Sequence, residues 1–328
     1  MAPWVLALTG GVGGAKLCLG LADELRGSQL HILVNTGDDF QHLGLHISPD
    51  VDTLLYTLAG RSNQTLGWGL ESETWHAMEG LEALNGETWF RLGDKDLATH
   101  LWRTQALADG RGLADVVDSL ALAMGVASKI HPMSEDAVRT TVCTADGDLL
   151  FQHYFVRLQC QPAVTGFRFE GIALARPNPN LLKQLAAKPP AAIVICPSNP
   201  FVSIDPVLQV PGMAQALTRS GAPIIAVCPI VAGMAIKGPA AKMMAELQLP
   251  VDAVAVAKRY CDCYPGLLSG FVIDDSDAIL APEIRSLGLD VTVTNTIMKS
   301  RSDKRRLAQL VLDMAACTKD VRQSWSNS

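Results

Sequence analysis

The sequence contains little charge and few aromatic residues, and neither sign of charge is in large excess. Charged residues make up 18% and aromatic residues 5% of the 328 residues, and the formal net charge is −6 at pH 7. A slightly acidic chain carries no broad basic surface, so we expect no nucleic-acid partner. An anionic substrate would have to be held by local positive charge.

Long apolar runs are also missing, and we expect no leader sequence. The longest apolar run, residues 222–236, contains two prolines and a glycine and is shorter than a membrane span. No basic segment precedes the first strand-like run, which argues against a signal peptide. The eight cysteines lie mostly in apolar runs, and the close pair Cys261 and Cys263 has no second pair at zinc-site spacing. We therefore expect a cytoplasmic protein with reduced thiols and no membrane partner.

Short apolar runs alternate with helical stretches along most of the chain. The helical stretches are residues 15–25, 239–247, 278–287 and 303–316, and the runs that predict strands are residues 5–8, 32–35, 192–196, 224–228, 253–257, 271–273 and 291–294. These runs are apolar on both faces, as in parallel strands covered by helices. The pattern predicts an α/β fold with a Rossmann-like, doubly wound, mostly parallel sheet.

The alternation stops between about residues 61 and 170. Two helices are predicted there, at 96–108 and 113–124, followed by strands 139–145 and 149–158 around the hairpin signal Asp146-Gly147. We interpret residues 61–170 as a smaller inserted α+β domain. Residues 1–60 and 171–328 then form the nucleotide-binding core.

A glycine-rich loop follows the first predicted strand and leads into a helix. Gly10, Gly11, Gly13 and Gly14 free the backbone N–H groups to face a phosphate at the helix N-terminus, with Lys16 close by. The loop is not a Walker A motif, and Lys16 stands where a dinucleotide fingerprint needs its third glycine, which disfavours an NAD-dependent dehydrogenase. The alternative is a tight turn without a ligand.

Carboxylates cluster after the second predicted strand. Asp38, Asp39, Asp50 and Asp52 lie near the carboxyl end of that strand, where α/β sheets bind their ligands. Hard oxygen ligands suit Mg²⁺, so we predict a metal site and catalytic role for Asp38, Asp39 and Asp50, without ranking them. The alternative is that these residues are loop carboxylates and helix N-caps.

Two later loops add polar and basic residues. Ser198 and Asn199 follow one strand and suit a base or sugar edge, whereas Lys237, Gly238 and Lys242 follow another. Lysines at a helix start oppose the helix dipole, so we expect them to meet an anion of the nucleotide, although solvated surface lysines are the alternative.

The inserted segment contains tryptophans beside an arginine. Trp68, Trp75, Trp89, Phe90 and Arg91 could flank a flat heteroaromatic ring, or the aromatic residues could simply form core. His100 and His131 have no partner at catalytic spacing, so we expect them to be structural.

These motifs together resemble those of the 2-phospho-L-lactate transferase (CofD) family. The similarity extends from about residue 4 to residue 295, and the blocks that carry it are residues 10–17, 35–39, 44–56, 90–104, 132–140, 197–204 and 237–247. Asn-Thr-Gly-Asp-Asp, Ser-Pro-Asp-Val-Asp-Thr and Cys-Pro-Ser-Asn-Pro occur in this order and are specific.

The resemblance implies a Mg²⁺-dependent transfer in coenzyme F420 biosynthesis. The ribityl hydroxyl of 7,8-didemethyl-8-hydroxy-5-deazariboflavin attacks a guanosine diphospho donor that carries an organic acid, and GMP leaves. The family's deazaflavin contacts fall on Asp50 and Arg91, with the inserted domain closing over this acceptor, and its phosphate loop falls on residues 10–16. A guanylyltransferase would supply the donor. The acid, which is phospholactate, phosphoenolpyruvate or phosphoglycerate, stays open, and we expect a homodimer.

The alternative function is that of a nucleotide-sugar-binding regulatory protein of similar fold. Proteins of that kind carry a glycine- and serine-rich stretch after the second strand. This chain has Asp38-Asp39-Phe40-Gln41-His42 at that place, which favours the transferase.

Overall fold

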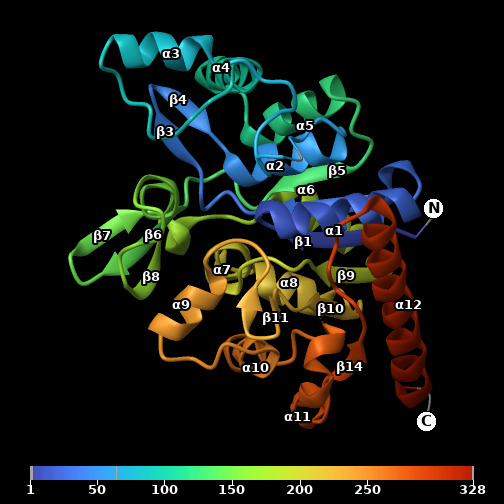
Figure 1. Cartoon of the computed structure of the whole chain (residues 1–328). Coiled ribbons are helices and arrows are strands. Elements are labelled where there is room, and N and C mark those ends of the chain that lie inside the picture. Colours follow the sequence, from blue (N-terminus) through green and yellow to red (C-terminus); the bar gives the residue numbers. More distant parts are fainter. Residues whose placement is uncertain (1–2, 64, 327–328) are drawn as a thin grey trace.

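The computed structural model describes residues 3–63 and 65–326, and a seven-stranded sheet lies at its centre (Figure 1). The strands follow the order β14-β13-β10-β9-β1-β2-β5, and every neighbouring pair is parallel. Their bounds are β1 Val5–Thr9, β2 Leu30–Val34, β5 Lys129–Pro132, β9 Ala192–Ile195, β10 Ile224–Val227, β13 Gly270–Ile273 and β14 Asp290–Val293.

Successive residues of each central strand enter opposite cores, because side chains alternate across a sheet. In β1, Leu6 and Leu8 join one core, whereas Val5 and Ala7 join the other. The core of Val5 and Ala7 is covered by α1 (Gly11–Glu24), α2 (Pro49–Leu58), α5 (Leu113–Ala123) and α12 (Arg301–Ser326). The core of Leu6 and Leu8 is covered by α6 (Pro179–Ala187), α7 (Asp205–Gln209), α8 (Met213–Arg219), α9 (Ala240–Glu246), α10 (Ala253–Cys263) and α11 (Ala281–Ser286).

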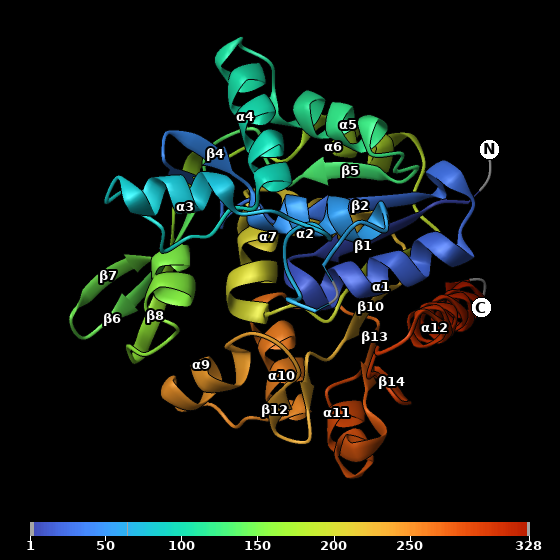
Figure 2. The same ribbon diagram turned by 45° about the horizontal axis from the view of Figure 1, so that its top comes forward.

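The long helix α12 runs beside α1 at one side of the molecule, as Figures 1 and 2 show from two directions. The two helices approach closely at Gly20 of α1. A Cβ atom at this position would lie 2.1 Å from the carbonyl oxygen of Lys304. The absence of a side chain at Gly20 therefore sets the distance between the two helices.

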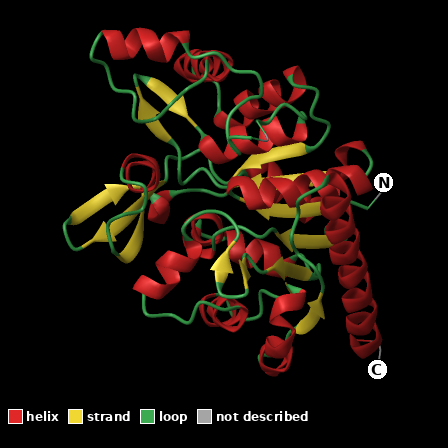
Figure 3. Cartoon of the chain, viewed as in Figure 1, coloured by secondary structure: helices red, strands yellow, loops and turns green. Residues whose placement is uncertain are grey.

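Smaller elements project from the carboxyl edge of the sheet (Figure 3). They comprise the hairpin β3 (Phe40–His42) and β4 (Leu45–Ile47), the helices α3 (His76–Ala83) and α4 (Asp94–Ala108), the antiparallel sheet β6 (Arg139–Thr144), β7 (Gly147–Leu150) and β8 (Val164–Glu170), and the hairpin β11 (Ile230–Val231) and β12 (Met234–Ala235). Short 3₁₀ or π turns lie at Gly27–Gln29, His153–Arg157, Ile172–Leu174, Pro200–Ile204 and Asp275–Leu280.

The predicted α/β, doubly wound class is confirmed, and the central sheet is wholly parallel. The limits of the inserted domain stay a prediction. Within the range 61–170, however, β5 pairs with β2 at the edge of the central sheet, and α5 packs on it. Among the described residues, no helix combines the length and apolarity needed to cross a membrane.

Two of the predicted strands are wrong. Residues 253–257 form the first turn of α10, because the side chain of Asp252 caps that helix and accepts a hydrogen bond from Ala255 N at 2.7 Å. Residues 149–158 start as a strand, but β7 ends at Leu150 and the chain turns into the π-helix His153–Arg157. The hairpin at Asp146-Gly147 is confirmed, and Gly147 has a positive φ of 123°.

Candidate active site

A cavity of about 780 Å³ lies at the carboxyl edge of the central sheet. The strand order reverses between β1 and β9, and the cavity opens where these two strands end. Open α/β sheets bind ligands at such a reversal point, and the volume is typical of a small-molecule site. The lining includes residues from both the core and the segment 61–170.

The glycine-rich loop forms the floor of this cavity. Gly10 N donates a hydrogen bond to Ser198 Oγ at 3.2 Å, and Gly11 N donates to Asp50 Oδ1 at 2.6 Å. Val12 and Gly13 follow in the first turn of α1, where backbone N–H groups have no acceptor within the helix. Both residues line the cavity, so their N–H groups are available to a phosphate.

The loop needs glycine for close packing as well as for access to a ligand. A Cβ atom on Gly13 would lie 2.5 Å from the carbonyl oxygen of Pro197, and one on Gly14 would lie 1.9 Å from Thr9 Oγ1. Gly11 has a positive φ of 67°. The loops after β1 and β9 therefore touch through these glycines, a reason that the sequence pattern did not reveal.

Asp50 lies in the first turn of α2 and faces the cavity. Its Oδ2 accepts a hydrogen bond from Asn35 Nδ2 at 2.9 Å, and its Oδ1 accepts the bond from Gly11. Burial raises the pKa of Asp50 to about 6, although the hydrogen bonds from Asn35 and Gly11 oppose this shift. The carboxyl group can therefore change its protonation state near neutral pH.

Asp38 is the second carboxylate that lines the cavity. Its pKa is raised well above the usual range, first by burial and then by the negative charge of Asp50, and within the described residues its buried Oδ1 has no hydrogen-bond partner. Between them the described residues offer no group of three or more metal-binding side chains. Mg²⁺ needs only one or two carboxylates when substrate phosphates supply further oxygens, so Asp38 and Asp50 fit this ion.

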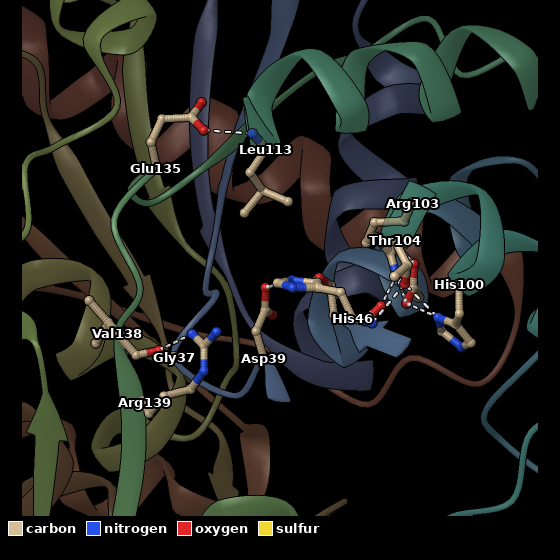
Figure 4. A network of polar contacts seen from close by, with 12 residues as sticks. Gly37, Asp39, His46, His100, Arg103, Thr104, Leu113, Glu135, Val138 and Arg139 are labelled. Atoms are coloured by element: carbon tan, nitrogen blue, oxygen red, sulfur yellow. Dashed lines mark hydrogen bonds and ion pairs between the residues drawn. The ribbon is translucent and has the colours of Figure 1, made fainter. Parts of the chain in front are cut away.

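Asp39, the third predicted metal ligand, is not among the residues that line the cavity. Its Oδ2 accepts hydrogen bonds from Ser48 Oγ at 2.9 Å and from His46 Nε2 at 3.1 Å, and Figure 4 shows Asp39 beside His46. These contacts connect the loop after β2 to β4 and to the start of α2. The structure thus separates Asp39 from the pair that faces the cavity.

A buried ion pair connects α4 to α2, the helix that carries Asp50. Arg103 is fully buried and pairs with Asp52 of α2, and it also lies 3.1 Å from His100 Nδ1 (Figure 4). His100 in turn lies 3.2 Å from Asp96. Asp52 and His100 therefore serve to join α4 to α2.

Three lysines also line the cavity: Lys16 of α1, Lys237 of the loop after β12, and Lys299 of the segment before α12. Within residues 3–63 and 65–326, none of them forms an ion pair with a described acidic side chain. The pKa of Lys16 is lowered by burial and by the positive charges of Lys237 and Lys304. Their charges are thus available to an anion, whereas Lys242 is already paired with Glu246.

The remaining predicted nucleotide residues also reach the cavity. Ser198, Asn199 and Gly238 line it, and Asn199 Oδ1 accepts a hydrogen bond from Phe201 N at 2.9 Å. The structure therefore brings the predicted residues Gly10, Gly11, Gly13 and Lys16 together with these later loops, while Gly14 lies beneath them against Thr9.

Aromatic side chains surround another part of the cavity. Trp68, Trp89, Phe90 and Arg91 line it, and the guanidinium of Arg91 lies 4.5 Å from the ring centre of Trp75. Stacking on the ring of Trp75 orients the planar guanidinium of Arg91 beside the cavity.

Sequence reasoning missed a second aromatic wall. Phe151 and Phe155 line the cavity, with ring centres 5.4 Å apart and planes inclined by 7°, and Gln152 lies between them in sequence. The four-residue spacing of the two rings is the one helical signal within a stretch that otherwise predicts a strand. Residues 296–299 were also missed; their position after the last strand is the signal that would have found them.

The comparisons with known proteins agree with this geometry. The family model described as 2-phospho-L-lactate transferase CofD matches residues 5–301. The chain belongs to this family. It is accordingly an enzyme of the CofD transferase type.

Similar proteins span nearly the full length of the chain. A phosphoenolpyruvate transferase from Streptomyces griseus is 35% identical over 95% of this chain and 98% of its own. A 2-phospho-L-lactate transferase from Methanosarcina mazei is 33% identical over 94% and 99%. A solved structure from Bacillus halodurans matches with a TM-score of 0.66 at 16% identity over 95% and 100%, which shows a shared fold. A second crystal structure of that Bacillus halodurans protein, a member of the UPF0052 family, matches with a TM-score of 0.62 at 17% identity over 94% and 99%.

Proposed function

We propose that this transferase moves a phospho-organic-acid group from a guanosine diphospho donor to the ribityl hydroxyl of 7,8-didemethyl-8-hydroxy-5-deazariboflavin, with release of GMP, in coenzyme F420 biosynthesis. One observation carries the proposal: a single cavity joins an aromatic wall, a carboxylate pair and three lysines around a glycine-rich helix start. The aromatic wall suits a flat acceptor, and the carboxylate pair suits a metal-bound diphosphate. The lysines and the helix start suit an anionic leaving group.

The aromatic part of the cavity suits the acceptor. Trp89, Phe90, Phe151 and Phe155 all line the cavity, so a flat tricyclic ring could pack against their apolar faces. Arg91 supplies hydrogen-bond donors at the same end. The acceptor's ribityl chain would then extend toward Asp50.

The guanosine diphospho donor suits the basic residues that line the cavity. A diphosphate between an organic acid and guanosine carries one negative charge on each phosphate and one on the carboxylate. Lys16, Lys237 and Lys299 supply three positive charges, and the N–H groups of Val12 and Gly13 can bind phosphate oxygens. The attraction is strong in a partly buried cavity, where screening by salt is weak.

The transfer needs one bond to form and one to break at phosphorus. The acceptor hydroxyl oxygen bonds to the phosphorus that carries the organic acid, and the bond from that phosphorus to the bridging oxygen breaks. The bridging oxygen keeps the electron pair and leaves as part of GMP, beside the lysines. The hydroxyl proton passes to the carboxylate of Asp50, which lines the cavity where the hydroxyl would lie.

Asp38 and Asp50 would hold Mg²⁺, which supplies charge neutralisation at the diphosphate when bound. Without a cation, the carboxylate pair and the diphosphate would repel each other. The residues of the chain otherwise act by orienting the two substrates, and no covalent intermediate is needed.

The acid carried by the donor is phospholactate, phosphoenolpyruvate or phosphoglycerate. Relatives named phosphoenolpyruvate transferase and 2-phospho-L-lactate transferase are 35% and 33% identical to the chain, so identity does not choose between them.

Product analysis tests the proposal. The protein would be mixed with GTP, a guanylyltransferase, the deazaflavin and each acid in turn, and the products would be identified by mass spectrometry. We expect GMP and a phosphodiester of the deazaflavin with one of the acids. Binding of a UDP-sugar without product from any acid would instead favour the nucleotide-sugar-binding regulator.

A further inference from the structure

Asp38 and Asp50, the two carboxylates that face the cavity, belong to separate segments of the chain. Asp50 lies in the first turn of α2, whereas Asp38 lies in the loop between β2 and β3. Their negative charges repel each other, so contacts from elsewhere must hold the two side chains together. Mg²⁺ demands near-ideal octahedral geometry, with ligands at about 2.0–2.1 Å. The contacts that fix these two segments therefore decide how well the pair binds the ion.

Arg103 of α4 holds the first turn of α2. Its side chain is fully buried, and its two terminal nitrogens donate hydrogen bonds to the two carboxylate oxygens of Asp52, one of them at 3.0 Å. A guanidinium that binds both oxygens fixes the orientation of its partner as well as the distance. Asp50 precedes Asp52 by two residues in the same turn, so its backbone is fixed with that of Asp52.

The same arginine reaches the strand that leads to α2. Its Nη1 donates to the carbonyl oxygen of His46 at 3.4 Å, and Thr104 Oγ1 accepts a hydrogen bond from His46 N at 2.8 Å. The ring of His46 lies 3.1 Å from Oδ2 of Asp39, the residue after Asp38 (Figure 4). Contacts of α4 therefore extend to both segments that carry a carboxylate of the cavity.

Stability alone is a poor explanation for this arrangement. Two charges lose their hydration when they are buried, and a buried ion pair often stabilises a fold no more than apolar side chains of similar size would. Arg103 is not among the residues that line the cavity, so it is not placed to bind a substrate or the metal ion directly. What the residue fixes is the better explanation for its place between the two segments.

We propose that Arg103 is a positioning residue, which holds Asp38 and Asp50 at the separation that a divalent cation needs without touching the cation or the substrates. This role rests on the Mg²⁺ site of the proposed function. Changes at Arg103 should therefore weaken the contribution of the metal ion to nucleotide binding, while the cavity lysines and the glycine-rich loop keep their own contribution.

Calorimetric titration with GDP, in the presence and in the absence of Mg²⁺, tests this role. In the wild-type protein we expect Mg²⁺ to lower the Kd for GDP about tenfold. Arg103→Lys keeps the charge but loses the planar fork, so we expect this gain to fall below about threefold. The Kd without Mg²⁺ should stay within about twofold of the wild-type value, because the glycine-rich loop and the cavity lysines are unchanged.

A second variant separates positioning from stability. Arg103→Met together with Asp52→Leu removes the whole ion pair and leaves no unpaired buried charge, so we expect this protein to fold and to lose the gain from Mg²⁺. Ala106→Gly is the matched control, because Ala106 is buried on the same helix and glycine lowers helix stability without removing a side-chain hydrogen bond or a charge. Thermal unfolding measures the stability of each variant, and the control should keep the full gain from Mg²⁺.

The role of Arg103 is overturned if the variants at this position keep the full gain from Mg²⁺, or if they weaken GDP binding equally with and without the ion. It is also overturned if Ala106→Gly loses the gain, since lost stability would then explain the effect. A wild-type protein that binds GDP equally well with and without Mg²⁺ would instead overturn the metal site of the proposed function, and this role of Arg103 with it.

Discussion

The individual acidic residues of the site differ mainly in what surrounds them. Asp52 is paired with Arg103, and Asp39 is hydrogen-bonded by Ser48 and His46, whereas Asp38 and Asp50 face the cavity with raised pKa values. Burial of a carboxylate without a cationic partner disfavours its charged form. Raised pKa values at a cavity are typical of functional residues.

Asp50→Asn should lower the turnover rate by roughly 10²–10³, because the variant removes the negative charge and the proton acceptor together. In the wild-type protein, activity at limiting Mg²⁺ should fall as the pH drops through about 6, because a proton on Asp50 of the metal-free site competes with the metal ion. Stability should change in the opposite direction. Since the folded pKa lies above the ordinary value of 3.8, the stabilising effect of protonation is complete below that value and is lost as the pH rises through about 6.

Turnover rates measured across pH check the predicted activity change. Thermal unfolding of the ligand-free protein across pH checks the predicted stability change. A pH profile of Asp50→Asn that keeps the wild-type inflection would assign that inflection to another group.

Removal of divalent cations should abolish the transfer, and addition of Mg²⁺ should restore it. Asp38→Asn should raise the Mg²⁺ concentration that gives half-maximal activity, because it removes one of the two carboxylates of the pair. The measurement is GMP release at fixed substrate concentrations against free Mg²⁺. Full activity in EDTA would contradict the metal proposal.

Arg91→Ala should weaken deazaflavin binding about tenfold, because the planar guanidinium stacked on Trp75 is lost. GDP affinity should stay near the wild-type value, since Arg91 lines the part of the cavity that we propose for the acceptor. Fluorescence titration with the deazaflavin, beside calorimetry with GDP, measures both. Equal loss of the two affinities would mean that Arg91 supports the whole cavity rather than the acceptor.

At the scale of elements, the site depends on loops that pack against one another. The glycine-rich loop after β1 contacts the loop after β9 through Gly13 and Pro197. The π-helix His153–Arg157 carries Phe155 to the cavity from a segment whose sequence predicts a strand. Local pattern failed there because the side chains that hold the turn, such as the buried Tyr154, pack against distant parts of the core.

Gly13→Val should reduce both stability and GDP binding. The added Cβ atom would lie 2.5 Å from the carbonyl oxygen of Pro197, so one loop must move, and overpacking of this kind typically costs about 1–3 kcal/mol. Thermal unfolding and GDP titration give the two effects. Gly80→Val is a suitable control, since Gly80 is exposed on α3 away from the cavity and a Cβ atom there meets no atom within 4 Å. Lost GDP binding at unchanged stability would mean that Gly13 serves the phosphate alone.

At the scale of the whole molecule, α12 covers the face of the sheet that α1 also covers, and residues 296–299 precede it directly. The packing of α12 on α1 therefore supports both the core and the segment 296–299, which lines the cavity. Gly20 and Lys304 meet in this contact, and a side chain at Gly20 would push the two helices apart.

Gly20→Val should destabilise the protein by about 2 kcal/mol or more, since its Cβ would lie 2.1 Å from a backbone oxygen that cannot easily move. Ligand affinity should fall as well, because the displaced helix α12 follows directly on residues 296–299, which line the cavity. Denaturant unfolding measures the first effect and titration the second. Wild-type stability would show that the helices tolerate a wider spacing.

The sequence by itself determined the class of fold and the positions of most site loops. Apolar runs with short connections specify buried parallel strands, and polar motifs at the strand ends must meet at one edge of such a sheet. The glycine-rich loop, Asp50, Ser198 and Lys237 could therefore be assigned to one site from the order of motifs along the chain, and all four line the cavity.

Only the tertiary structure decided which carboxylates face that cavity and which distant segments line it. Asp38 and Asp39 are neighbours in sequence, yet Ser48 and His46 hold Asp39 while Asp38 is left without a partner for Oδ1 in the described chain. The positions of Phe155 and of the segment 296–299 at the cavity likewise depend on contacts between residues far apart in sequence. Local periodicity sets the elements, whereas the orientation of a side chain is decided by the distant residues packed around it.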